Sequence, residues 1–344
     1  MDGKITVIMP AYNAGEFIEG SVKSVLRQSY ENFELIVVND GSKDNTAELV
    51  EKIAAGDSRV RLITVENGGP AMARNRGLDA MGTDTDYVMF LDADDEMTED
   101  AMSYALSAAE KGAEFVMMGF TIINPDGSRR DYNEHEEYLD ESSLGDALPR
   151  LYMANMLNQV WAKLISAKLI RDGHLRFHDY RWGEDRLFIF DVLERAEKSA
   201  VLPECKYHYE MHPGESLITS FYDKKPEACC LADRRMAELC RRFGTKDDSG
   251  CRYMFVKSIF SCMTNMYSPS CRLDGEGRRA YVREIIKNPQ VQERSRGIYG
   301  GFAPKALCGI MHTGLVWLNM LAFRFVAFTG KFAPKLFMAL KHKK

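Results

Sequence analysis

Short apolar runs alternate with helical stretches four times in the first hundred residues. The runs are Ile5–Pro10, Phe33–Asn39, Val60–Val65 and Tyr87–Leu91. Nearly unbroken runs such as the last one are typical of strands buried on both faces of a parallel sheet. Pro70 suits the first position of the third helix, Ala71–Met81. This alternation predicts a doubly wound, mostly parallel α/β sheet.

Three carboxylates follow the fourth run: Asp92, Asp94 and Asp95. Residues two apart on an extended chain point to the same side, so Asp92 and Asp94 can converge on one ligand. In open α/β sheets, ligands bind outside the carboxyl ends of the strands. Two carboxylates at that edge suit Mg²⁺ or Mn²⁺, which also takes phosphate oxygens from a substrate. The alternative is a solvated acidic turn that caps a helix beginning near Thr98.

Length and charge limit the function classes. A chain of 344 residues is large enough for one large or two modest units. Residues 1–293 hold all 50 acidic residues and 36 of the 45 basic ones, a net of −14, whereas the remainder carries +9. A basic end of this kind indicates contact with an anionic surface, membrane or nucleic acid. We expect no signal peptide, since the N-terminus enters a strand at once, and the eight cysteines, all after residue 200, have no metal spacing.

Five segments of the first hundred residues occur in the order and spacing of a known family. They are VIMPAYNAGEFI, the region of Gln28, ELIVVNDGSKDNT, ENGGPAMARNRG and FLDADD. With them, the sequence resembles a family 2 glycosyltransferase of the bacterial cell-surface polysaccharide type. The resemblance implies a GT-A fold, which has a Rossmann-like nucleotide-binding sheet. No GxGxxG or GxxxxGK[ST] motif is present, so neither a dinucleotide fingerprint nor a P-loop is expected.

The expected domains follow from that resemblance. The GT-A catalytic domain spans 1–220, with its nucleotide-sugar half at 1–100 and its acceptor half at 101–220. A helical extension follows at 221–295. The segment 296–344 is basic and amphipathic, and we expect it to associate with a membrane.

The resemblance also implies a donor site. The residues expected to bind the nucleotide are Pro10, Ala11, Tyr12, Asn13, Asp40, Arg74 and Asp92. Tyr12 offers a ring to the base, or else packs in the core. Arg74 contacts the nucleotide or its phosphates, or else forms a surface ion pair. Asp94 is expected to hold the metal ion, Mn²⁺ or Mg²⁺, together with Asp92, which contacts the ribose or the ion's waters.

The segment Trp182-Gly183-Glu184-Asp185 is similar to the family's later acidic motif. An inverting transfer needs a base that takes the proton of the attacking hydroxyl. The resemblance assigns that role to Asp185, with Glu184 as the second candidate. The alternative is that Asp185 caps the helix Arg186–Leu193. Trp182 lines the acceptor face, or else lies in the core.

A family pattern Tyr-x-Tyr-Arg…Ser is altered here, because Glu210 stands in place of the arginine before Ser216. His212 is the candidate for that missing role or for the metal, and a surface histidine is the alternative. The acidic stretch Asp131–Glu141 is expected to be a solvated loop or lid over the site.

The tail contains 18 residues, Ala306–Phe323, without a formal charge. We expect one amphipathic helix with an apolar face from Leu307 to Phe325. Its length is marginal for a membrane span, and the lysines that follow (Lys331, Lys335, Lys341, Lys343 and Lys344) favour an interfacial helix. A helix packed on the protein itself is the other alternative.

The sequence therefore predicts a metal-dependent, inverting glycosyltransferase. The donor is a nucleoside-diphosphate sugar, UDP-sugar by default, and the acceptor is a hydroxyl of a glycan or lipid-linked acceptor. We expect a cytoplasmic protein, peripheral on the membrane, with no nucleic-acid partner. A non-catalytic nucleotide- or glycan-binding relative is the alternative, and a nucleotidyltransferase is disfavoured because its glycine-rich loop is absent.

Overall fold

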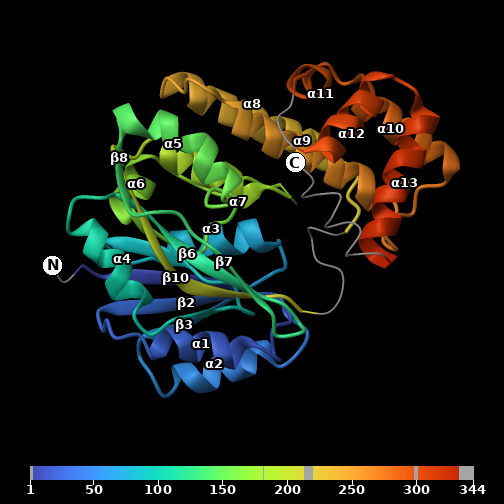
Figure 1. Ribbon diagram of the computed structural model, residues 1–344. Coiled ribbons are helices and arrows are strands. Elements are labelled where there is room, and N and C mark those ends of the chain that lie inside the picture. Colours follow the sequence, from blue (N-terminus) through green and yellow to red (C-terminus); the bar gives the residue numbers. More distant parts are fainter. Residues whose placement is uncertain (1–2, 181, 213–219, 298–300, 333–344) are drawn as a thin grey trace. The chain divides into compact units, whose positions relative to one another are not determined.

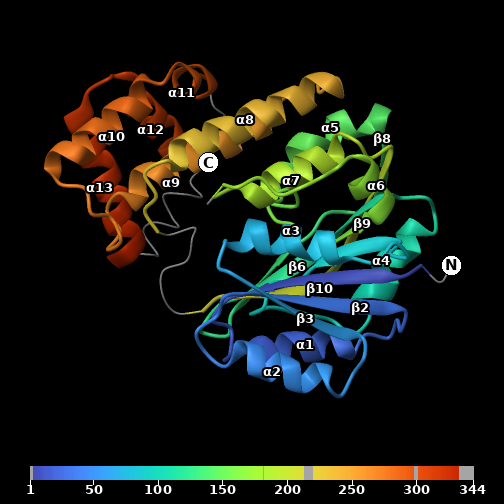
Figure 2. The same ribbon diagram turned by 180° about the vertical axis from the view of Figure 1, so that it is seen from behind.

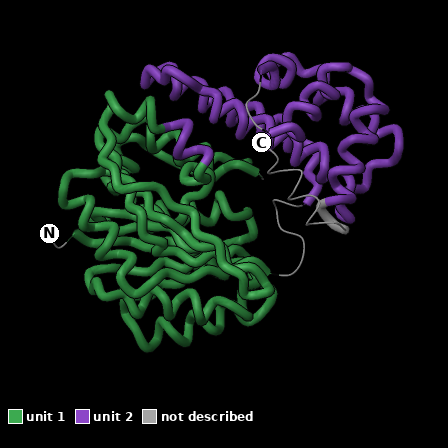
Figure 3. Tube along the Cα trace, in the orientation of Figure 1, with its two compact units in different colours: residues 1–147, 154–213 green, residues 148–153, 214–344 purple. Residues whose placement is uncertain are grey.

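The computed structural model describes residues 3–180, 182–212, 220–297 and 301–332. The chain forms two compact units (Figure 3). The first comprises Met1–Ala147 and Ala154–Pro213, and the second comprises Leu148–Met153 and Gly214–Lys344. The expected boundaries at residues 220 and 295 remain predictions.

The first unit is a mixed sheet with helices on both faces (Figures 1 and 2). Its strands are β1 Ile5–Ala11, β2 Phe33–Asp40, β3 Val60–Val65, β4 Tyr87–Phe90, β5 Glu96–Met97, β6 Phe115–Ile123, β7 Arg129–Tyr132, β8 Glu137–Asp140, β9 Lys163–Ser166 and β10 Lys198–Glu210. The main order is β3-β2-β1-β4-β9-β6-β10-β5. The β3-β2-β1-β4 and β6-β10 pairings are parallel, whereas β9 is antiparallel to β4 and β6. The predicted mostly parallel α/β sheet is confirmed.

The helices of this unit are α1 Ile18–Leu26, α2 Thr46–Ala54, α3 Pro70–Ala80, α4 Ala101–Ala109, α5 Glu141–Met153, α6 Ala167–Asp172 and α7 Glu184–Leu193; the last residues of α5 belong to the second unit. Alternation along β1 divides the core: Ile5, Val7 and Met9 pack with residues of α1 and α4, while Ile8 lies against Gly77 of α3. A Cβ at Gly77 would lie 2.3 Å from Ile8, so glycine here allows α3 to approach β1.

The expected loop at Asp131–Glu141 is wrong in part. Tyr132 ends β7, which pairs with β6, and Glu137–Asp140 forms β8, which pairs with β10. Both strands have polar sequences, so the hydrophobic pattern could not reveal them. Their hydrogen bonds come from the strands that they extend.

The second unit is helical, with α8 Lys225–Arg242, α9 Ser249–Asn265, α10 Gly275–Lys287, α11 Pro289–Arg294, α12 Phe302–His312 and α13 Val316–Phe332. The single helix expected over Ala306–Phe323 is wrong, because the chain breaks between α12 and α13, where Gly314 has φ +69°. No helix in the described ranges is long and apolar enough to cross a membrane. The predicted residues Ser216, Lys335, Lys341, Lys343 and Lys344 lie outside the described residues.

Candidate active site

The glycine loop before α3 is held by Asp40 at the end of β2. The Asp40 carboxylate accepts hydrogen bonds from the backbone N–H groups of Gly68 and Gly69, both at 2.8 Å, and from the Asn67 amide at 3.2 Å. Asp40 is only 3% exposed. In this structure Asp40 therefore fixes the loop that begins α3, and contact with a base N–H remains a prediction.

The end of β1 lies at the same edge of the sheet as the end of β2, because the two strands are parallel and in register from Ile5↔Phe33 to Ala11↔Asn39. Ala11 is buried and Pro10 is partly buried. Tyr12 is 53% exposed, so the alternative of core packing is wrong. Asn13 adopts φ +50°, and its side-chain oxygen accepts from the Lys43 N–H at 2.8 Å. These contacts place an exposed aromatic ring at the predicted nucleotide edge.

Arg74 joins the predicted donor and base residues. Its Nη2 donates to Asp92 Oδ1 at 2.8 Å and its Nη1 to Asp185 Oδ1 at 2.6 Å, with Glu184 Oε1 at 3.8 Å from Nη1. The residue is 4% exposed and stands on α3, so the alternative of a surface ion pair is wrong. The guanidinium also lies over the Phe177 ring at 5.5 Å. Arg74 therefore ties together side chains from three segments that are far apart in sequence.

Asp185 lies in the first turn of α7, which begins after Gly183 in a left-handed conformation. No side chain caps this helix, so the capping alternative for Asp185 is wrong. Burial raises the pKa of Asp185 to about 7 against the lowering effect of Arg74. Burial also raises the pKa of Glu184. A carboxylate with a pKa near neutrality suits a general base, because it is both available and basic at physiological pH.

Asp95, which the sequence analysis left without a role, anchors the acidic segment. It is fully buried and accepts from the Tyr207 hydroxyl at 2.6 Å and from the Glu210 N–H at 2.9 Å. Tyr207 in turn accepts from the Asp92 N–H at 3.2 Å and stacks on Trp161, with ring centroids 4.4 Å apart. Burial and the neighbouring Asp92 raise the pKa of Asp95 well above its ordinary value. The acidic segment is therefore a fixed part of the sheet edge, not a solvated turn.

Asp94 points to His212. The carboxylate oxygen Oδ2 lies 3.8 Å from His212 Nε2, and that buried nitrogen has no hydrogen-bond partner in the described structure. His212 stacks on Phe17 with ring centroids 4.0 Å apart, and its side chain is 29% exposed, so its predicted role and the surface alternative both remain open. Burial and the neighbouring Asp92 raise the pKa of Asp94.

These residues fit a divalent cation that completes its shell with substrate. Within the described ranges, no group of three or more His, Cys, Asp or Glu side chains is arranged to hold a metal ion. Asp94 and the unpartnered His212 nitrogen nevertheless offer one oxygen and one nitrogen ligand, which Mn²⁺ accepts. Diphosphate oxygens and water would have to supply the other positions.

The remaining predicted residue, Trp182, is partly buried, and the Arg186 guanidinium lies 5.2 Å from its ring centroid. No role was predicted from the sequence for Asp95, Tyr207 or Lys163. Lys163 is a fully buried lysine on β9 whose Nζ donates to the Trp161 carbonyl at 3.1 Å. The available signal was a lysine inside the apolar run Val160–Ile165.

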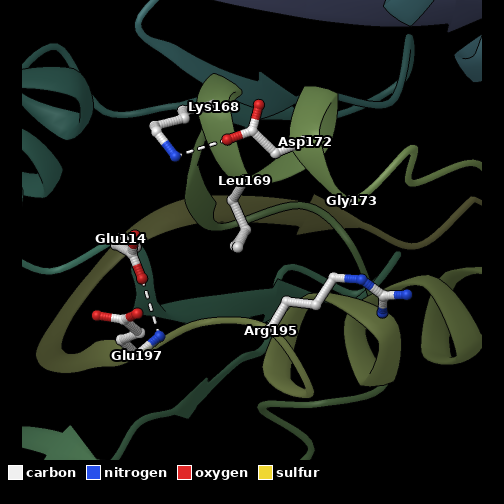
Figure 4. Close-up of a pocket in the computed structure, with 7 residues that line it drawn as sticks. All are labelled: Glu114, Lys168, Leu169, Asp172, Gly173, Arg195 and Glu197. Atoms are coloured by element: carbon white, nitrogen blue, oxygen red, sulfur yellow. Dashed lines mark hydrogen bonds and ion pairs between the residues drawn. The ribbon is translucent and has the colours of Figure 1, made fainter.

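A separate pocket of about 330 Å³ contains none of these residues (Figure 4). Its lining residues are Glu114, Lys168, Leu169, Asp172, Gly173, Arg195 and Glu197. Glu114 and Glu197 directly precede β6 and β10, so the pocket lies at the amino ends of these parallel strands. Lys168 forms an ion pair with Asp172 at 2.6 Å, and the Glu197 N–H donates to the Glu114 carboxylate at 2.8 Å. The candidate active site is at the opposite, carboxyl end of the sheet.

Solved structures share the fold of the whole chain. S. aureus TarS 1–349 superposes with a TM-score of 0.66 at 18% identity, covering 95% of this chain and 91% of that one. This likeness confirms the expected GT-A fold, an α/β sheet domain followed by helices.

Sequence relatives define the family. Residues 6–168 match the model described as Glycosyl transferase family 2. The uncharacterized glycosyltransferase EpsJ of Bacillus subtilis (strain 168) is 32% identical over 215 residues, 61% of each chain. Glycosyltransferase GlyA of Streptococcus pneumoniae serotype 4 is 31% identical over 230 residues, which span only 31% of GlyA. A putative teichuronic acid biosynthesis glycosyltransferase of Bacillus subtilis (strain 168), TuaG, is 37% identical over 210 residues, 60% of this chain and 79% of TuaG. The chain spans less than two thirds of the length of EpsJ and of GlyA. With these matches, the chain belongs to glycosyltransferase family 2.

Proposed function

We propose that this enzyme transfers a sugar from a UDP-sugar to a hydroxyl of a glycan or lipid-linked acceptor, with inversion, in cell-surface polysaccharide synthesis. The observation that carries the proposal is the Asp92–Arg74–Asp185 bridge, which joins the donor edge to a carboxylate with a pKa of about 7. A UDP donor is supported by TarS, which has the same fold and is crystallised with UDP-GlcNAc and with UDP. Relatives named for teichuronic and teichoic acid synthesis support a cell-surface product.

In the proposed mechanism, the residues divide into a donor side and an acceptor side. Tyr12 stacks on the base and the loop held by Asp40 lies beside the nucleotide. The acceptor hydroxyl attacks the anomeric carbon of the donor from the side of Asp185, which takes the hydroxyl proton. The bond from that carbon to the diphosphate breaks, and UDP leaves with the electron pair. One displacement of this kind inverts the anomeric configuration.

Arg74 and the metal ligands have supporting roles. Arg74 orients Asp185, since the Nη1–Oδ1 hydrogen bond fixes the carboxylate. Asp94 and His212, with Asp92 through water, would hold Mn²⁺ or Mg²⁺. When bound, the ion would neutralise the charge that develops on the diphosphate. The negative edge formed by Asp92, Asp94 and Asp95 favours a cation, because burial and the charge of Asp92 raise the pKa of both Asp94 and Asp95.

We also propose that the protein is cytoplasmic and peripheral, on the anionic face of a membrane. Trp317, Leu321 and Phe325 are one helical turn apart on α13, and they are 64%, 61% and 56% exposed. The other side of α13 is anchored, as Phe323 is buried and its ring centroid lies 5.4 Å from that of Phe260 on α9. After Glu293 the sequence has nine basic and no acidic residues. An apolar stripe among cations suits an anionic lipid surface.

The test is release of UDP from a panel of UDP-sugars, with and without EDTA. The wild-type protein is expected to hydrolyse at least one donor slowly, and EDTA is expected to stop it until Mn²⁺ is restored. Asp94→Ala is expected to abolish turnover without loss of thermal stability, because the side chain is 45% exposed. Asp126→Ala, in an exposed turn, is the matched control.

The alternative, a non-catalytic binder, makes a different prediction. It would bind UDP with wild-type affinity in calorimetry and release no UDP from any donor. Turnover by Asp94→Ala at the wild-type rate in EDTA would show that the metal assignment is wrong while leaving the enzyme assignment intact.

A further inference from the structure

Lys163 is a charged residue in a place where charge is costly. Its side chain has 0% exposure on β9, in the middle of the sheet. Its Nζ donates to the Trp161 carbonyl at 3.1 Å, and no carboxylate of the described residues lies within ion-pair distance of it. An ammonium that has left water for one carbonyl partner is destabilising unless another charge compensates.

The strand register places Lys163 at the catalytic edge. β9 is antiparallel to β4, with Tyr87 opposite Ser166 and Val88 opposite Ile165. The first residue of β9 is Lys163, so it lies toward the carboxyl end of β4, where Asp92 follows. On its other side Lys163 is opposite Met117 of β6. The topology thus brings an ammonium to the edge that already holds the acidic residues.

Asp185 is the carboxylate with which Lys163 interacts electrostatically. The charged groups facing Asp185 are Arg74 from α3, Glu184 from α7, Asp92 after β4, and Lys163 from β9. Arg74 divides its charge among three carboxylates. One guanidinium cannot neutralise three carboxylates, so Lys163 supplies a second positive charge to the cluster.

We infer that Lys163 is a positioning residue for the transfer reaction, whose buried positive charge keeps Asp185 in the ionised form that accepts the acceptor proton. The inference rests on the proposed role of Asp185 as the base. It explains why a lysine stands where the strand pattern calls for an apolar residue. Burial lowers the pKa of Lys163 to about 7 and raises that of Asp185 to about 7, so the two groups titrate in the same range.

The direction of the effect follows from the charges. Loss of the Lys163 charge removes a contribution that lowers the pKa of Asp185, so that pKa rises. At pH 7 a smaller fraction of Asp185 is then ionised. The rate falls about fivefold for the first unit by which the pKa rises above 7, and by nearly tenfold for each further unit. The acid limb of the pH–rate profile moves to higher pH, and activity returns in alkaline buffer.

The experiment uses full-length Lys163→Met, which removes the charge and nearly keeps the volume. We expect kcat for UDP release at pH 7 to fall about fivefold or more, with unchanged UDP affinity in calorimetry. Thermal stability is expected to stay equal or to rise, because a buried ammonium is replaced by an apolar side chain. Lys163→Gln, which keeps an N–H donor for Trp161, is the second variant should methionine prevent folding.

Lys206→Met is the matched control. Lys206 is another largely buried lysine of the same sheet, on β10, but its partners are Asp100 and Glu204, both at 2.6 Å. It is expected to lose stability and to keep the wild-type pH profile. A Lys163→Met protein with wild-type kcat and an unmoved acid limb would overturn the inference, and so would joint loss of stability and UDP affinity.

Asp185→Asn separates this inference from the proposed function. If Asp185→Asn retains wild-type turnover, the proposed base is wrong. If Asp185→Asn loses turnover and Lys163→Met does not, only the role of Lys163 is wrong. The double variant is expected to be no slower than Asp185→Asn alone, because the lysine acts through the aspartate.

Discussion

The two units contain different exceptions to the usual division between buried apolar and exposed charged side chains. The sheet unit buries charge: Arg74, Lys163 and Asp95 are 4%, 0% and 0% exposed. The helical unit exposes apolar groups, with Trp317 at 64% and Leu321 at 61%. Buried charge and exposed apolar surface are the informative exceptions in a folded protein. This difference agrees with the proposed division of roles, in which the first unit holds the active site and the second contacts a surface.

Both units bury charged side chains, since Lys225 and Asp233 of the helical unit are 1% and 4% exposed. In the helical unit, cysteines fill the contact between α8 and α9, with Cys229 and Cys262 Sγ atoms 3.8 Å apart and Cys240 and Cys251 likewise. Burial of a thiol costs little desolvation free energy, because the thiol carries no charge. In the sheet unit, Arg74, Asp95, Lys163 and Glu184 are buried at the edge of the candidate active site. The free-energy cost of burying charged side chains is expected at a site whose chemistry requires shifted pKa values.

The largest expected effect tests the buried charges directly. Asp185→Asn keeps the shape of the side chain but cannot accept a proton, and loss of a general base typically costs about 10²–10⁴ in rate. UDP affinity is expected to be unchanged in calorimetry, since the base faces the acceptor. Joint loss of binding and turnover would assign Asp185 a structural or metal role.

The pH dependence of the wild-type enzyme belongs to the same prediction. Asp185 must be ionised to act, and its pKa is raised to about 7. The rate is therefore expected to rise with pH between about 6 and 8 and to fall below that window. A rate independent of pH across it would contradict the assignment.

A second prediction concerns Arg74. Arg74→Met leaves the partly buried carboxylates of Asp92, Glu184 and Asp185 without their shared cation, and removal of one partner from a buried ion pair costs about 3–5 kcal/mol. Urea unfolding measures this loss of unfolding free energy. Arg176→Met is the matched control, since the Arg176–Asp79 pair is 46% and 51% exposed and is expected to contribute below about 1 kcal/mol. If both variants lost the same unfolding free energy, the Arg74 cluster would contribute no more to stability than an exposed ion pair.

Sequence patterns predicted helices and strands well where the sequence also marks the end of the element. The expected strand Val60–Val65 is confirmed with the same bounds, and the helix expected over Ala71–Met81 is α3, Pro70–Ala80. Pro70 stands in its first turn, as expected. By contrast, the break at Gly314 was hidden by the continuous apolar pattern around it.

The site could be predicted only in part, for a physical reason. The resemblance named Arg74, Asp92 and Asp185 one by one, but Arg74 and Asp185 are 111 residues apart, and only the fold reveals that they are hydrogen-bonded. Lys163 lies outside the segments that resemble the family, and Tyr207 belongs to the altered Tyr-x-Tyr-Arg…Ser pattern, which implied no role for it. Their roles depend on sheet order, which places β9 between β4 and β6. No local pattern contains that information.

A third prediction tests the hydrogen bonds by which Tyr207 holds the acidic segment Asp92–Asp95 in place. Tyr207→Phe keeps the stack on Trp161 but leaves Asp95 Oδ2 and the Asp92 N–H without their partner. An unsatisfied buried polar group costs about 1–3 kcal/mol, which urea unfolding can measure. Tyr104→Phe, whose hydroxyl accepts one N–H at 3.2 Å from Glu204, is the control and is expected to lose less. A Tyr207→Phe protein as stable as wild type would show that this network is not structural.

The last prediction tests, by point substitution, whether the exposed apolar side chains of α13 in the helical unit bind a membrane. Truncation before α12 is a poor test, because Asn319 and Phe323 are buried and the Tyr267 hydroxyl donates to the Met320 carbonyl at 2.6 Å, so the cut would open the unit. Replacement of Trp317, Leu321 and Phe325 by serine keeps those contacts and removes the exposed stripe.

The wild-type protein is expected to sediment with vesicles that contain phosphatidylserine, and the triple variant to remain in the supernatant with unchanged UDP release. Tyr138→Ser, at an exposed aromatic residue of β8, is the control and should sediment like wild type. Arg324→Gln is expected to weaken binding by only about 1 kcal/mol, the usual contribution of one basic residue near an anionic surface. Salt should therefore weaken the wild-type interaction without ending it, since the apolar stripe is not screened. Complete release at high salt would mean that the basic residues alone make the contact, and the exposed apolar side chains of α13 would then need another partner.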